Sequence, residues 1–110
     1  MGMKIADAIP ADGGALLIKV SGRVDTSSCR ELHDRIEVLF RGGNFRLLID
    51  MSEIDGLCSS GISVLLTADA TARAHGGSLM LLDPSVKTQT MLMILGVSDS
   101  LSIAPSARAM

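Results

Sequence analysis

The strongest constraint on the fold is a regular alternation of short apolar runs with helical patterns that end at glycine. The apolar runs at residues 15–20, 45–51 and 78–82 have the length and composition of buried strands. Two helical patterns lie between them, and these stop at Gly42-Gly43 and at Gly76-Gly77. Alternating strands and helices predict parallel neighbouring strands joined by right-handed crossovers, and therefore an α/β domain.

The first helix is expected to begin at Ser28, because Ser28 and Glu31 have the spacing of a capping box. Its apolar residues fall on one stripe at helical spacing: Cys29, Leu32, Ile36, Leu39 and Phe40. A second helix is expected over residues 60–75. A third should follow Asp83-Pro84-Ser85, with Pro84 in its first turn, and end at Gly96. A last strand at 101–103 precedes a small-residue tail that we expect to be flexible.

Length and composition limit the possible functions. The 110 residues are expected to form one domain over 1–110, with a core of about 15–103. The net charge is −2, and the chain has no Trp or Tyr and two Phe. Both facts argue against nucleic-acid binding, which needs a basic face and aromatic platforms for stacking. Cys29 and Cys58 form no disulfide framework, and no long apolar segment suggests a leader or membrane insertion. We expect a cytoplasmic protein, a monomer or a weak homodimer.

The most informative segment leads from the strand at 45–51 to Ser59-Ser60-Gly61. After a brief connection, these residues open the second helix, so that two hydroxyls lie at a helix N-terminus, where negative charge is favoured. This is a suitable place to add and remove a phosphate. The alternative is that Ser59 or Ser60 simply caps the helix. Asp25 also follows a strand, so we expect it at the same end of the domain.

Nothing in the sequence points to catalysis. The chain contains no G-x-S-x-G elbow, no phosphate-binding loop and no HExxH pattern. His33 and His75 have no companions at metal or catalytic-triad spacing, so we expect no catalytic residue, metal or cofactor. Met91, Met93 and their apolar neighbours are expected to pack on the third helix, although methionine-rich faces also dock partners.

Four segments, in order, resemble the STAS domain family of bacterial anti-sigma factor antagonists. They are Val20-Ser21-Gly22-Arg23-Val24-Asp25, Leu48-Ile49-Asp50-Met51-Ser52, Cys58-Ser59-Ser60-Gly61-Ile62 and Gly76-Gly77-Ser78-Leu79. The resemblance covers residues 15–103. It implies a small single-domain STAS fold, with a mixed or parallel sheet of four to five strands and three to four helices.

The resemblance also implies a function, namely partner switching. In such antagonists the first serine of the Ser-Ser-Gly motif, here Ser59, is phosphorylated by an anti-sigma factor that is itself a serine kinase. The unphosphorylated form binds that kinase, and a phosphatase resets the cycle. The partner-binding surface would then include Asp25, Cys58, Ser59, Ser60 and Gly61.

One position departs from the family pattern. Antagonists usually carry Asp directly before the first serine, whereas this chain has Cys58. Other family members lack the phosphorylation switch, such as the small STAS subunits of lipid-transport ATP-binding cassette complexes. The alternative function is therefore that of an adaptor subunit, in a transport or signalling complex, that does not respond to phosphate.

Overall fold

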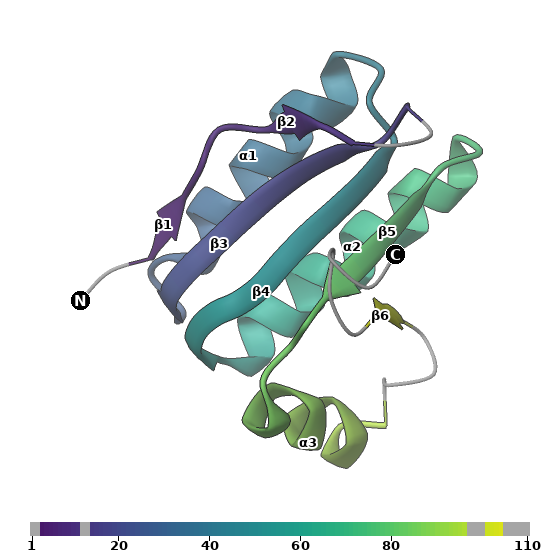
Figure 1. Cartoon of the computed structure of the whole chain (residues 1–110). Coiled ribbons are helices and arrows are strands. Elements are labelled where there is room, and N and C mark those ends of the chain that lie inside the picture. The colour runs from purple at the N-terminus through teal and green to yellow at the C-terminus, as the bar shows by residue number, and fades with distance from the viewer. Residues whose placement is uncertain (1–2, 12–13, 97–100, 105–110) are drawn as a thin grey trace.

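The computed structural model describes residues 3–11, 14–96 and 101–104, which form one mixed sheet and three helices (Figure 1). The helices are α1 (Cys29–Arg41), α2 (Ser59–Ala74) and α3 (Val86–Ile94). Four strands run parallel: β3 (Leu16–Val24), β4 (Arg46–Leu57), β5 (Ser78–Leu82) and β6 (Ser102–Ala104). The short strands β1 (Lys4–Ile5) and β2 (Ile9–Pro10) both pair antiparallel with β3, so the sheet has the order β1-β3-β4-β5-β6.

The predicted α/β class, the parallel neighbours and the three helices are confirmed. The strands β1 and β2 were not predicted, because two residues are too short to show a periodic pattern. The prediction that Pro84 lies in the first turn of the third helix is wrong, because Pro84 precedes the N-cap residue Ser85. Helix α3 begins at Val86 and is capped by Ser85, whose Oγ accepts a 3.1 Å bond from the Thr88 N–H. The predicted flexible tail falls on residues 105–110, outside the described residues.

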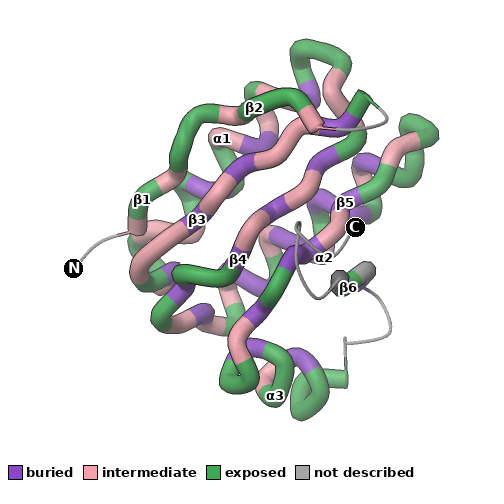
Figure 2. The backbone as a smooth tube through the Cα atoms, in the orientation of Figure 1, coloured by how far each residue is buried: buried purple, intermediate pink, exposed green. Residues whose placement is uncertain are grey.

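Helices α1 and α2 lie side by side on one face of the sheet, and the core lies between them and the strands (Figures 1 and 2). The stripe expected on the first helix is confirmed, because Leu32, Ile36 and Phe40 are buried and Cys29 and Leu39 pack against the same core. Opposite them lie the inward residues of the central strands: Ile18, Val20, Leu47, Ile49, Met51, Leu79 and Leu81. Within the described residues no helix is both long and apolar enough to cross a bilayer.

Strand β4 is longer than expected and continues to Leu57. Its pairing with β3 shifts register twice, between Lys19 and Ser21 and between Gly22 and Arg23, and each shift leaves one extra residue on β4. These bulges break the regular alternation of apolar and polar residues after Met51, which is why the sequence suggested a loop there. The extended strand delivers the Ser-Ser-Gly motif directly from the sheet into α2.

Candidate functional site

The end of β4 and the end of β3 are joined where α2 begins. Gly56 and Leu57 pair with Arg23 and Val24, and the N–H of Cys58 donates a 2.9 Å bond to the Val24 carbonyl oxygen. Asp25 follows Val24 directly. The sequence-based expectation that Asp25 and the 50–61 segment meet at one end of the domain is confirmed, although a paired strand stands where the loop was expected.

Asp25 organises the entry to α1. Its Oδ1 accepts bonds from the Ser27 and Ser28 backbone N–H groups, at 3.0 and 2.9 Å, and from the Ser27 hydroxyl at 2.7 Å. The Ser27 hydroxyl is the largest cause of a lowered Asp25 pKa, about 2 instead of 3.8, followed by the Ser28 N–H. The carboxylate of Asp25 is therefore a local anchor of the helix entry.

The predicted capping box at Ser28 is wrong. The Ser28 side chain makes no capping bond to the helix, and the Glu31 N–H bonds instead to the Ser28 carbonyl oxygen. The Ser28 hydroxyl turns back toward the end of β3, where it accepts from the Asp25 N–H at 2.9 Å. The Ser28 oxygen thus accepts from the Asp25 N–H and not from a helix N–H, and its hydroxyl lies 3.1 Å from both Asp25 Oδ1 and the Arg23 carbonyl oxygen. The Ser28 backbone is also helical (φ −93°, ψ −18°), whereas a capping residue is extended.

Helix α2 begins without a side-chain cap. Its N-cap residue is Cys58, in an extended conformation, and the thiol makes no capping bond. Ser59 and Ser60 already lie inside the helix, so the alternative that one of them is the capping serine is wrong. The exposed Ser59 hydroxyl makes no hydrogen bond to any residue in the described part of the chain. It is therefore available to an external group.

Gly61 is buried where α2 packs against the sheet. A Cβ at this position would lie 2.7 Å from Leu57 Cδ1 and 2.9 Å from Val24 Cγ1. Only a glycine at this position allows so close an approach. The absence of a side chain lets the first turn of α2 sit directly on the ends of β3 and β4.

An apolar groove runs between the start of α2 and helix α3. Its cavity of about 680 Å³ is lined by Cys58 and Ser59 and by five residues of or next to α3: Lys87, Thr90, Met91, Ile94 and Leu95. Ile94 and Met93 are 78% and 70% exposed. The expectation that the methionines pack on the third helix holds for the half-buried Met91 and is wrong for Met93. The groove has the character of a protein-docking surface.

The structure thus brings together some of the predicted site residues and not others. Cys58 and Ser59 line the groove, whereas Ser60 and Gly61 lie behind them in α2, and Asp25 lies at the end of the neighbouring strand. The sequence left the role of α3 open between packing and docking, because its apolar residues form one continuous run without a single helical face. An unbroken apolar run on a short helix was the available signal.

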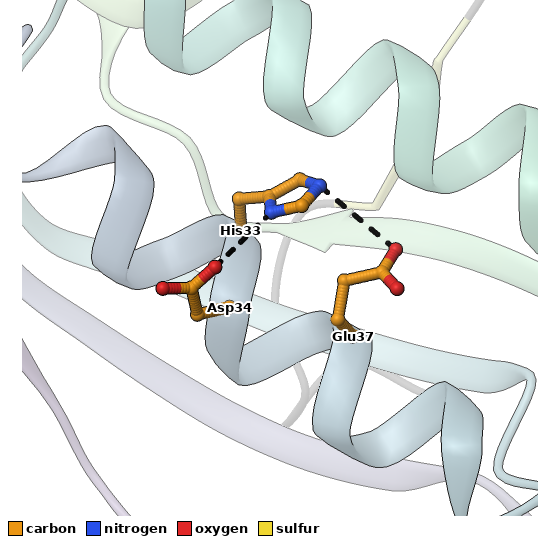
Figure 3. A network of polar contacts seen from close by, with 3 residues as sticks. All are labelled: His33, Asp34 and Glu37. Carbon is orange, nitrogen blue, oxygen red and sulfur yellow. Dashed lines mark hydrogen bonds and ion pairs between the residues drawn. The ribbon is translucent and has the colours of Figure 1, made fainter.

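The two histidines are exposed, and each has one or two neighbouring side chains. His33 lies between two carboxylates of its own helix, with Nδ1 3.4 Å from Asp34 Oδ1 and Nε2 3.9 Å from Glu37 Oε1 (Figure 3). All three side chains are at least 40% exposed. His75 stacks on Phe45 with 4.1 Å between ring centroids. No group of three or more His, Cys, Asp or Glu residues that could hold a metal occurs in the described ranges.

The model of the family described as "Mlab, STAS domain" matches residues 8–104 of the sequence. This chain belongs to the STAS domain family. None of the curated protein sequences matches it significantly. The solved structures described next are 16–18% identical to this chain, so they show its fold alone.

Three solved structures with a fold similar to this STAS domain come from two kinds of protein, anti-sigma factor antagonists and an anion transporter. An anti-sigma factor antagonist from Mycobacterium paratuberculosis superimposes with a TM-score of 0.85 and 18% identity over 98% of this chain and 90% of that one. The antagonist SpoIIAA in its unphosphorylated form gives 0.72 and 17% over 94% and 90%. The murine Solute Carrier 26 family member A9 anion transporter gives 0.72 and 16%, over 86% of this chain and 17% of the transporter.

Proposed function

We propose that this STAS domain is an anti-sigma factor antagonist that acts by partner switching in the cytoplasm. In its unphosphorylated form it binds an anti-sigma factor kinase through the groove between α2 and α3. Phosphorylation of Ser59 releases the kinase, and a phosphatase restores the binding form. The domain contributes the docking surface and the acceptor hydroxyl, and the partner contributes the chemistry.

One observation carries the proposal: Ser59 is exposed, makes no hydrogen bond in the described part of the chain, and lies on the wall of an apolar groove. In the transfer step, Ser59 Oγ forms a bond to the γ-phosphorus of ATP while the bond from that phosphorus to the bridging oxygen breaks. ADP leaves, and the hydroxyl proton passes to a base of the kinase or to water. The fold tolerates such a group, because a relative, the Bacillus cell fate determinant SpoIIAA, has a structure in the phosphorylated form.

The physical basis of release is desolvation. A phosphoserine carries a charge of about −1.5 to −2 at neutral pH. A partner that covers the groove must remove water from this charge, and an unpaired buried charge costs several kcal/mol. Because each ~1.4 kcal/mol is a factor of ten, affinity is expected to fall on the order of a thousandfold.

The test compares proteins captured by the wild type, by Ser59→Asp and by Thr67→Asp. Thr67 is an exposed residue eight positions further along α2 and serves as the charge-matched control. We expect an ATP-binding kinase to be captured by the wild type and by Thr67→Asp but not by Ser59→Asp. Ser59→Asp should stay folded, because the first turn of α2 has no acidic residue and the helix dipole favours one.

A second candidate function is that of a constitutive adaptor. It is favoured by Cys58, which replaces the family Asp at the N-cap, and by the name of the matching family model, which is Mlab. An adaptor would use the same groove without a phosphate switch. Capture of the same partner by the wild type and by Ser59→Asp would support the adaptor and contradict the switch.

A further inference from the structure

Lys87 is the one charged residue among the described side chains that line the groove. It borders two neighbouring cavities, the large one that it shares with Ser59 and a small one, of about 30 Å³, that it shares with Asp55. No carboxylate in the described part of the chain forms an ion pair with Lys87 within 4.0 Å. The lysine therefore faces the groove without an internal partner.

The position of Lys87 is unfavourable for helix stability. It is the second residue of α3, in a first turn that has no acidic residue to balance it. A positive charge at a helix N-terminus is repelled by the helix dipole, at a typical cost of about 0.3–1 kcal/mol. An anion placed in the groove would relieve this repulsion.

We propose that Lys87 binds the phosphate group of phosphorylated Ser59 and holds it in the groove between α2 and α3. This inference rests on the proposed phosphorylation of Ser59. Phosphorylation would then both add charge at the docking surface and fill the space that the partner occupies. The first turn of α2, which begins at Ser59 and has no side-chain cap, supplies further N–H groups without intrahelical acceptors.

Other charged groups at this end of the domain are less well placed. Asp55 borders the small cavity beside Lys87. As a carboxylate it would repel a phosphate and cannot help to bind one. Arg23 lies across Gly56, with its Nε 3.6 Å from where a Cβ of that glycine would be, and does not line the groove. Cys58 lines the groove and adds a thiol.

The experiment uses protein with phosphoserine incorporated at position 59 during translation, so that no kinase is needed. Phosphorus NMR then gives the second pKa of the phosphate, which is ordinarily near 6. We expect this pKa to be higher in Lys87→Gln than in the otherwise unaltered phosphoprotein by about half a pH unit, since the loss of the cation disfavours the dianion. Lys4→Gln, which changes the net charge equally at a distant strand, should leave the pKa unchanged.

The outcomes separate this inference from the proposed function. Equal phosphate pKa values in Lys87→Gln and the unaltered phosphoprotein, or equal changes in both lysine variants, would overturn the role of Lys87 and leave the switch intact. A partner that is retained by Ser59→Asp would overturn the switch without altering the titration. Because Lys87 is exposed, its replacement should not unfold the domain.

Discussion

The N–H of Cys58 donates a 2.9 Å hydrogen bond to the carbonyl oxygen of Val24, so the residue at the N-cap position of α2 is tied to the last residue of β3. Two chain segments that are more than thirty residues apart in the sequence therefore share one fixed point. The first turn of α2 is held on the sheet at this point, and with it the Ser59 hydroxyl at the edge of the groove. The position of the candidate phosphorylation site depends on strand pairing, not on a flexible loop.

Replacement of Gly61 by alanine should destabilise the domain. The new Cβ would lie 2.7 Å from Leu57 Cδ1 and 2.9 Å from Val24 Cγ1, and the branched Val24 side chain has little freedom to move. We expect the free energy of unfolding, measured with urea, to fall by about 1–3 kcal/mol, although alanine is the better helix former. Ser63→Ala, at an exposed position of the same helix, should change it by less than about 0.5 kcal/mol. An unchanged Gly61→Ala stability would mean that Leu57 moves aside at little cost.

Acid should weaken the entry to α1. The Asp25 pKa is about 2 in the folded protein, whereas an unperturbed aspartate, as in the unfolded chain, has a pKa of 3.8. The ionised carboxylate therefore stabilises the fold fully above pH 3.8. This contribution is lost as the pH falls from 3.8 to 2. We expect Ser27→Ala to raise the Asp25 pKa in a carbon NMR titration, because the Ser27 hydroxyl is the largest cause of its depression. Thr26→Ala is the neighbouring control, and a similar rise in both variants would contradict this assignment.

The sequence predicted the layers of the fold well because its signals there are periodic. The stripe from Leu32 to Phe40 and the apolar strands identified α1 and the central sheet. The Ser59-Ser60-Gly61 motif was found because its three residues are consecutive in the sequence. The extension of β4 was missed because two bulges interrupt the alternation after Met51.

The groove could not be predicted, since it forms between helices that are separated by a strand in the sequence. Ser59 and Lys87 face the same cavity only once β5 has returned the chain past α2. The cap of α1 was misread for a different reason. Ser28 has the right spacing to Glu31, but spacing alone does not show that Asp25 competes for the same hydroxyl.

Replacement of Cys58 by aspartate should stabilise α2. Cys58 already has the extended backbone conformation of an N-cap residue but makes no capping bond. An aspartate there would accept from an N–H of the first turn, and it would also interact favourably with the helix dipole. We expect a gain of about 1 kcal/mol in the free energy of unfolding in urea at pH 7. Cys58→Ala, which lacks an acceptor, should show no gain, and equal stabilities of the two variants would show that the cap does not form.

The exposed face of α3 should be needed for binding and not for folding. Ile94 is 78% exposed, so Ile94→Ser should change the free energy of unfolding by less than about 0.5 kcal/mol. Leu92, two residues earlier, is fully buried, and Leu92→Ala should cost about 2–5 kcal/mol. If the groove is the docking surface, Ile94→Ser should still lose the captured partner, because the partner would bury this side chain. A stable Ile94→Ser protein that retains its partner would place the docking surface elsewhere on the domain.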